Sequence, residues 1–360
     1  MRDIKSMQKT RHMTALFIAV TFFIIGGTAV QAQEVDHNNE TLEKEFADGY
    51  KRKQPNHVWN FAWENDSFGD GSDQNYTNGV RASYINLNAD FPKVLEAASK
   101  ILPMFEVNET SFVTYSFGQN MYTPRNIRRR TLNPNDRPYA AHLYGSVGMA
   151  TLKGNRADEV ELSVGVIGPE ALGEPIQREV HQLVDTTIPK GWEHQLGTEP
   201  AITLGWQRVW PEYRRWTVDS LAISVDPHIG ATVGNVYTFA NTGVTFRISP
   251  KGERFHAAPA RVRPGLPGAS VFEIPEKEWG WSLFAGVDAR AIGRNIFLDG
   301  NTFSDSHSVD KNYLVADLNA GISLIYKKTR ISYTLVHRTE EFEGQDDRQV
   351  FGSISISRQF

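Results

Sequence analysis

The sequence predicts an all-β protein, a twelve-stranded antiparallel transmembrane β-barrel that carries a short helix in an external loop. Three observations support this prediction. Apolar and polar residues alternate over runs of about 9–11 residues, the length that a tilted membrane strand needs. The chain ends on Phe360 directly after such a run, as bacterial outer-membrane barrels do. Short polar turns also alternate with long segments, as periplasmic turns alternate with external loops.

The first residues predict export from the cytoplasm. Residues 2–11 are basic, and an apolar run over residues 14–30 leads into a Val-Gln-Ala sequence. Residues 1–32 therefore have the pattern of a secretory signal peptide, with cleavage expected after Ala32 and an uncleaved anchor as the alternative. Residues 33–55 are polar and lack periodicity, so we expect a periplasmic leader, followed by the barrel at 56–360.

Composition excludes several classes of protein. The chain has no cysteine, which rules out disulfides, thiolate nucleophiles and cysteine-bound metals. A net charge of -4 argues against nucleic acid as the main partner. The mean hydropathy of -0.41 and the absence of a second long apolar run exclude a helical membrane protein. A barrel stays compatible, because its strands show lipid only every second residue. We expect a monomer in the outer membrane.

Twelve strands follow from the alternation, and an even number suits a single-chain barrel. The predicted ranges are 57–68, 76–89, 110–121, 139–153, 157–167, 200–211, 216–231, 234–249, 278–292, 312–327, 329–339 and 349–360. A soluble β-sandwich would alternate in a similar way and is the alternative fold. Two connections, 88–109 and 250–277, should be short periplasmic turns, and nothing in the sequence explains their length.

Three unusual segments are expected at the same end of the barrel, because every second loop of an antiparallel barrel lies at that end. If the N-terminus is periplasmic, the loops after the first, third and fifth strands are all external. These loops contain residues 64–79, residues 123–139 and a helical insertion within residues 167–200. We therefore expect any chemistry at this end.

The insertion predicts a short amphipathic helix. Pro175 suits its first turn, and His181 lies one turn from Gln177 and from Asp185. A histidine with an acidic neighbour is a candidate for catalysis, whereas the alternative is a loop helix in which His181 is a structural partner. Four apolar residues form one stripe at helical spacing: Ile176, Val180, Leu183 and Val184.

The first external loop offers oxygen ligands. Asn65, Asp66 and Thr77 belong to two segments that place amide, carboxylate and hydroxyl oxygens at adjacent strand ends. Such oxygens suit a hard cation, Ca²⁺ rather than Zn²⁺. The alternative is a polar loop rich in turn formers, residues 70–73, and the spacing matches no EF-hand.

The second external loop carries a cluster of four arginines: Arg125, Arg128, Arg129 and Arg130. Guanidinium groups at an outer rim would meet lipopolysaccharide phosphates, which they bind in a bidentate manner; a solvated loop is the alternative. No Gly-x-Ser-x-Gly elbow occurs, since Gly145–Gly148 lacks the spacing. Without a nucleophile, a histidine-activated water with a metal-stabilised oxyanion is the economical scheme.

Several motifs in combination resemble the outer-membrane lipid A 3′-O-deacylases over nearly all of the mature chain. They are END, YTNG, YTP, DRPYA, IGPEALGEPIQREVH and GWEHQL, in this order, with the C-terminal Phe360. The resemblance implies a twelve-stranded barrel with its active site near the outer rim, beside a loop helix. It also implies Ca²⁺-dependent removal of the 3′-linked acyloxyacyl group from lipid A, by a mechanism similar to that of secreted phospholipase A₂.

The same resemblance implies roles for particular residues. His181 matches the catalytic histidine that activates water. Asn65 and Asp66 match an Asn-Asp pair, and Thr77 a threonine, around the metal and the oxyanion. A basic pair that binds substrate falls within Arg128 to Arg130, where the loop differs in length.

Three other interpretations stay open. An outer-membrane phospholipase would use a His-Ser pair within a His-Ser-Asn-Gly motif, which is absent. A porin-like or structural barrel needs no active site, although twelve strands leave little room in the lumen. If His181 is not the base, His142 and His194 are the next candidates. Whether lipid A or another acylated lipid is the substrate also stays open.

Overall fold

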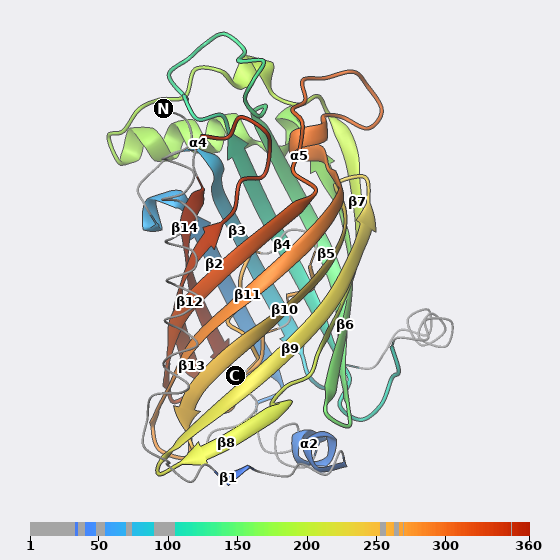
Figure 1. Ribbon diagram of the computed structural model, residues 1–360, viewed down its shortest axis with the longest axis vertical. Helices are drawn as coiled ribbons and strands as arrows, with labels where there is room; N and C mark the ends of the chain where they lie inside the picture. Colours follow the sequence, from blue (N-terminus) through green and yellow to red (C-terminus); the bar gives the residue numbers. More distant parts are fainter. Residues whose placement is uncertain are drawn as a thin grey trace, which may run out of the picture.

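Twelve strands close into an antiparallel barrel in the computed structural model (Figure 1). The structure describes residues 33–34, 40–47, 55–69, 74–89, 105–252, 257–262, 266–268, 270–346 and 348–360. The single sheet has 14 strands; β14 pairs with β2 and β7 with β9, which leaves the short β1 and β8 outside the ring. The predicted fold is confirmed. The predicted signal peptide and residues 70–73 lie outside the described residues.

The barrel strands lie close to their predicted ranges. They are β2 (His57–Asn65), β3 (Asn75–Asn86), β4 (Phe112–Thr123), β5 (Ala140–Lys153), β6 (Arg156–Ile167), β7 (Glu199–Val209), β9 (Leu221–Gly234), β10 (Tyr237–Pro250), β11 (Trp279–Asn295), β12 (Leu314–Tyr326), β13 (Thr329–Arg338) and β14 (Gln349–Gln359). The other elements are β1 (Gln33–Glu34), α2 (Glu40–Glu45), η2 (Asp66–Phe68), η3 (Pro169–Ala171), α4 (Gly173–Leu183), η4 (Trp192–His194), β8 (Arg214–Val218) and α5 (Ile296–Asp299). None of the described helices has the length and apolar character needed to cross a membrane.

The predicted strand 216–231 is wrong at its start. Residues 214–218 form β8, which folds back on β9 through a two-residue turn, with Val218 opposite Leu221. Asp219 adopts a left-handed conformation, φ 51°, which a two-residue hairpin turn requires. The turn takes β8 out of the barrel wall, where its other edge pairs with β1.

The distribution of side chains is that of a barrel in lipid. Along β2, Trp59, Phe61 and Trp63 point outward and are exposed, whereas Asn60 and Glu64 point inward and are buried. The same apolar exterior and polar interior recur around the ring. A soluble sandwich would bury its apolar faces, so this pattern excludes that alternative.

The described part of the long connection between β10 and β11 lies inside the lumen. This part, residues 257–262, 266–268 and 270–278, enters the barrel from the end that holds the C-terminus, the lower end in Figure 1. Arg261 Nε donates to Glu64 Oε1 at 2.8 Å, and Asn60 Nδ2 donates to Ser270 O at 3.1 Å. A segment rich in proline and glycine thus supplies partners for polar side chains of the wall, one from a side chain and one from the backbone. This accounts for the length of a connection expected to be a short turn.

Apolar clusters close the lumen at both ends. At the upper end, Phe297 of α5 stacks on Tyr122 with ring centroids 4.0 Å apart, within a buried cluster. At the lower end, Phe272 of the inserted connection packs in a second cluster with Phe46, which follows α2. The stretch predicted as a leader therefore contributes a helix and an apolar contact at the lower end.

Candidate active site at the upper rim

The ends of β2 and β3 build the first half of the candidate site. The Asn65 side chain caps the turn that follows β2. Asp66 is only 1% exposed, and its Oδ2 accepts a hydrogen bond from the backbone N of Gln74 at 2.8 Å. Asn65 stands opposite Asn78 in the β2–β3 register, so Thr77 and Asp66, the first residue of η2, each lie one residue beyond this pair. The structure thus brings the predicted oxygen-bearing residues to adjacent strand ends.

Thr77 lies in a β-bulge. The register between β3 and β4 shifts between Tyr76 and Asn78, so Thr77 has no partner residue in the ladder. Bulges redirect a side chain in this way, often beside active sites. The Thr77 hydroxyl lies 2.6 Å from Thr123 Oγ1, and both side chains are buried. Thr123 is therefore a neighbour of the candidate site that the sequence analysis missed.

These polar side chains lie on the outward side of the barrel wall. Along β4, Asn120 and Tyr122 point into the lumen, so Gln119 and Thr123 point away from it. Gln119 Nε2 donates to the backbone O of Ala171 in η3 at 2.5 Å. Gln119 therefore faces the segment that carries α4, and Thr123 lies on the same outward side of the wall.

Helix α4 lies crosswise at the upper end of the barrel (Figure 1). It buries a polar stripe, Gly173, Gln177 and His181, and Gln177 Oε1 accepts from Trp192 Nε1 at 2.8 Å. The predicted apolar stripe faces the other way, and Leu183 is 86% exposed. This inverts the arrangement of a helix on a water-soluble protein and is the arrangement expected of a helix whose outer side meets lipid. The exposed apolar residues of α4 are Ile176, Val180, Leu183 and Val184.

A backbone carbonyl orients His181, which is 8% exposed. His181 Nδ1 lies 2.6 Å from Thr187 O. A carbonyl can only accept, so Nδ1 carries the proton of the neutral ring and Nε2 holds the lone pair. Arg128 secures the same turn, since its Nη2 donates to Thr187 Oγ1 at 3.1 Å.

The four arginines have different neighbours. Arg125 forms an ion pair with Asp346 and donates its backbone N to Asp136. Arg130 pairs with Glu193 at 3.2 Å; the hydrogen bond between them raises the pKa of the guanidinium and lowers the pKa of the carboxyl. Arg129 Nε donates to Thr131 Oγ1 at 3.1 Å, and its Nη2 to Leu132 O at 3.3 Å. Arg128 contacts Thr187, as described above.

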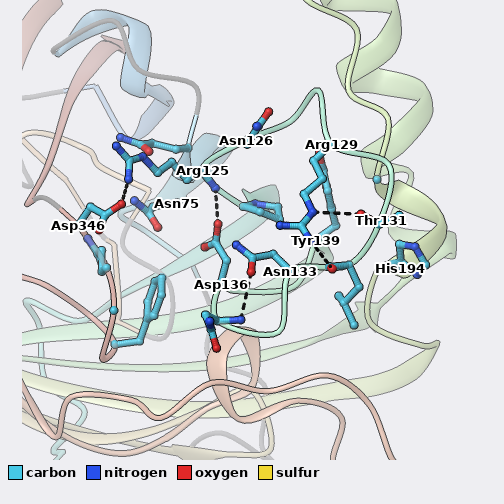
Figure 2. A pocket seen from close by; sticks show the side chains of 18 residues that line it. Asn75, Arg125, Asn126, Arg129, Thr131, Asn133, Asp136, Tyr139, His194 and Asp346 are labelled. Carbon is cyan, nitrogen blue, oxygen red and sulfur yellow. Dashed lines mark hydrogen bonds and ion pairs between the residues drawn. The ribbon is translucent and has the colours of Figure 1, made fainter.

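A pocket of about 360 Å³ opens beside the candidate site (Figure 2). Arg125 and Arg129 line it, but Arg128 and Arg130 do not. Tyr139 contributes an aromatic ring, and Asn75 belongs to the segment that joins Asp66 to Thr77. The pocket therefore adjoins the strand ends described above.

The other candidate histidines lie elsewhere. His142 points into the lumen and is buried, so the barrel wall separates it from Thr77. His194 lies at the edge of the rim pocket. Over the described part of the chain, no three His, Asp or Glu side chains gather as a metal site.

These observations define a class of protein, a closed outer-membrane barrel with a segment inside its lumen and with polar side chains on the outward side of its upper rim. The family model of the outer membrane protein LpxR matches residues 16–360. The chain therefore belongs to the LpxR family.

The fold is also found among solved structures. LpxR from Salmonella typhimurium matches with a TM-score of 0.70 at 18% identity, over 84% of this chain and 100% of that chain. At this identity the match shows the fold alone. The translocator domain of the autotransporter NalP from Neisseria meningitidis covers 88% of this chain and 93% of that chain, at 8% identity and a TM-score of 0.34, too low to support an argument. No curated protein matches the sequence.

Four residues around the candidate site were not predicted from the sequence. Gln119 and Thr123 had a detectable signal, because they place polar side chains on the outward face of a membrane strand. Thr187 and Trp192 had none, since they act through a backbone carbonyl and an indole N–H whose positions depend on how the loop folds.

Proposed function

We propose that the chain is an outer-membrane lipid A deacylase that hydrolyses the ester of the 3′-linked acyl or acyloxyacyl group. The observation that carries this proposal is the direction in which Gln119, Thr77 and Thr123 face, outward and toward the segment of α4. The outer side of that helix is apolar, so acyl chains of the outer leaflet can approach it. Membership of the LpxR family supports the same function.

In the proposed reaction His181 is the general base. Its Nε2 takes a proton from water while the water oxygen bonds to the ester carbonyl carbon, which gives a tetrahedral oxyanion. When this intermediate collapses, the ester C–O bond breaks and the imidazolium returns the proton to the sugar oxygen. The products are a fatty acid and a lipid with a free hydroxyl. The Thr187 carbonyl keeps the ring in the tautomer that this reaction needs.

Ca²⁺ is the proposed cofactor, with Asn65, Asp66 and Thr77 as its ligands. These donors are all oxygens, with a single carboxylate, which suits a hard cation better than Zn²⁺. When bound, such a cation polarises the ester carbonyl and stabilises the developing oxyanion. The 2.6 Å contact with Thr123 restrains the Thr77 hydroxyl, and Thr77 precedes Asn78, the partner of Asn65 in the β2–β3 pairing.

Three of the arginines have different proposed roles. Arg129 lines the rim pocket and is proposed to bind substrate. Arg128 is proposed as a positioning residue, because it holds the turn whose carbonyl orients His181. Arg130, which pairs with Glu193 on the surface, retains only the weaker proposal of long-range attraction to phosphates.

Two alternatives remain to be separated from this proposal. A phospholipase-like esterase could use the same groups on another lipid, so the choice of substrate decides between them. A porin-like role conflicts with a lumen that holds the described part of the β10–β11 connection.

The test uses the purified barrel in detergent with lipid A and, in parallel, a diacyl glycerophospholipid. We expect fatty acid release from lipid A, loss of release with a chelator, and better recovery with Ca²⁺ than with Zn²⁺. Asp66→Ala should lose release while the protein keeps its heat-modifiable mobility on gels. Full release in excess chelator would refute the role of the metal. Equal rates on both lipids would refute the substrate class.

A further inference from the structure

Helix α4 begins in close contact with Trp192 of η4, a side chain that is 2% exposed. The contact is at Gly173, the first residue of the helix. A Cβ atom at this position would lie 2.5 Å from Trp192 Cη2 and 2.6 Å from Ala141 Cβ, too close for any residue but glycine. The start of α4 is therefore held against Trp192 and against the outer wall of the barrel.

A second contact with Trp192 lies one turn further along α4. Trp192 Nε1 donates to Gln177 Oε1 at 2.8 Å, and the Gln177 side chain is 4% exposed. Both groups are removed from water, so a rotation or a slide of the helix that breaks this bond costs free energy. His181 follows Gln177 by four residues and lies on the same buried face. The bond that fixes Gln177 therefore also fixes the direction in which α4 presents His181.

Tyr139 in turn restrains Trp192. The two rings have centroids 4.9 Å apart within one buried cluster. Gly191 permits this packing, because a Cβ atom there would lie 2.5 Å from Tyr139 Cε2. The Tyr139 hydroxyl donates to the backbone O of Ile127 at 3.4 Å, and the same carbonyl accepts from the backbone N of Lys190 at 2.9 Å. The segment that carries Trp192 is thus bound to the loop that carries Tyr139.

The lumen holds the stretch that precedes Tyr139. Two residues earlier, in the same DRPYA motif, Arg137 is fully buried, and its Nη1 donates to Glu341 Oε2 at 3.1 Å. The guanidinium also lies over the Tyr122 ring, 4.9 Å from its centroid, at the cluster that closes the upper end of the lumen. The motif therefore spans the rim, with Arg137 on the lumen side and Tyr139 on the side of α4.

We infer that Trp192 is a positioning residue, which sets through Gln177 the height and the rotation at which α4 presents His181 to the ends of β2 and β3. The inference rests on the proposed function, because it takes His181 as the base. The role differs from that of Thr187, whose carbonyl orients the His181 ring but does not place the helix. A misplacement of about 1 Å can lower turnover by about 10²-fold, so the account predicts a loss in kcat.

The test combines turnover with a direct measurement on His181. Trp192→Phe removes the indole N–H but keeps a ring to pack on Tyr139, and Gln177→Leu removes the acceptor. Both variants and the double variant are assayed in detergent for fatty acid release from lipid A. NMR of histidine-labelled protein, assigned by comparison with His181→Gln, reports on the His181 imidazole without any substrate.

The matched control is Trp206→Phe. It removes an indole hydrogen bond of 3.2 Å to Asp158, on the half of β7 that lies away from the candidate site. Asp158 keeps its two hydrogen bonds from Arg208, so the control removes the same kind of group at little structural cost.

We expect Trp192→Phe and Gln177→Leu each to lower kcat by about 10–10²-fold, with KM within about threefold of the parent and with gel mobility retained. Because both remove one hydrogen bond, the double variant should lose no more than the weaker single variant. The His181 signals should move in all three and stay in place in Trp206→Phe. Gln177→Leu provides the same test if Trp192→Phe does not fold.

Near-parent kcat in the folded variants, additive losses in the double variant, or unchanged His181 signals would overturn the inference. A parent that releases no fatty acid, while the His181 signals respond as expected, would instead overturn the proposed function and leave the placement of α4 by Trp192 intact.

Discussion

His181 owes its orientation to a backbone carbonyl and not to the acidic neighbour that the sequence suggested. Asp185 follows the helix in a left-handed conformation, φ 51°, and the hydrogen bond to Nδ1 comes from Thr187, 2.6 Å away. Arg128 then holds Thr187 from the adjacent loop. The orientation of His181, the proposed base, therefore depends on residues of two loops.

Substitution of His181 directly tests its proposed role as the general base. His181→Gln keeps the length and hydrogen-bonding capacity of the side chain, so the variant should fold but lose about 10²–10⁴-fold in turnover. Steady-state fatty acid release and gel mobility report turnover and folding separately. Near-normal turnover in folded His181→Gln would end the assignment and direct attention to His194 at the pocket edge.

Thr77 offers a second test, because its hydroxyl has both a structural and a proposed catalytic partner. Thr77→Val removes the hydroxyl and leaves buried Thr123 without its 2.6 Å contact, at a cost of about 1–3 kcal/mol. Thr77→Ser keeps the hydroxyl. We expect Ser to retain hydrolysis and Val to lose it. Thr123→Val separates the roles: if it lowers stability equally but spares hydrolysis, the Thr77 hydroxyl acts on the reaction. An equal loss in both Val variants would make it structural.

The connection between β10 and β11 contacts β2 and β3, the two strands that lead to the proposed metal ligands. Its Arg261 and Val262 both bond to Glu64, two residues before Asp66. Its Val262 O also lies 3.4 Å from the Tyr76 hydroxyl, next to Thr77. A segment that enters from the lower end thus holds the strand ends from the lumen side.

Glu64→Gln tests this segment as a structural element. The amide keeps an acceptor for Val262 N but leaves the Arg261 charge unpaired in the lumen, which should cost up to about 3–5 kcal/mol. Thermal unfolding, followed by gel mobility, should shift to lower temperature. Arg178→Gln on the surface of α4 is the matched control and should leave the transition in place. An unchanged transition in Glu64→Gln would mean that the segment contributes little to stability.

Strand positions could be predicted from the sequence, whereas the direction of α4 could not. Alternation with a period of two follows from the pleat, so eleven of the predicted strands lie near their observed ranges and only β9 needed correction. The apolar stripe of α4 was visible as a pattern, but Leu183 faces outward because lipid replaces water there. The lumen filling was hidden, because residues 257–278 bond mainly through backbone groups that have no sequence signature.

On the scale of the whole molecule, the barrel wall separates a polar lumen from an apolar outer surface. Polar groups fill the lumen, which apolar clusters close at both ends, and Phe297 of α5 is fully buried in the upper one. The candidate site lies on the other side of the wall, since Gln119 and Thr123 point away from the lumen. A lipid can therefore approach it by diffusion within the membrane. This arrangement suits an enzyme that acts on its own membrane better than a channel.

The most direct measurement is the mass of lipid A from outer membranes that contain this chain. The parent protein should lower the mass of hexa-acylated lipid A by one 3′-linked acyl or acyloxyacyl group in the presence of Ca²⁺. Folded His181→Gln, recovered at the same level in the outer membrane, should leave the mass unchanged. An unchanged mass with the parent would contradict the deacylase account, and an equal loss with parent and variant would contradict the mechanism.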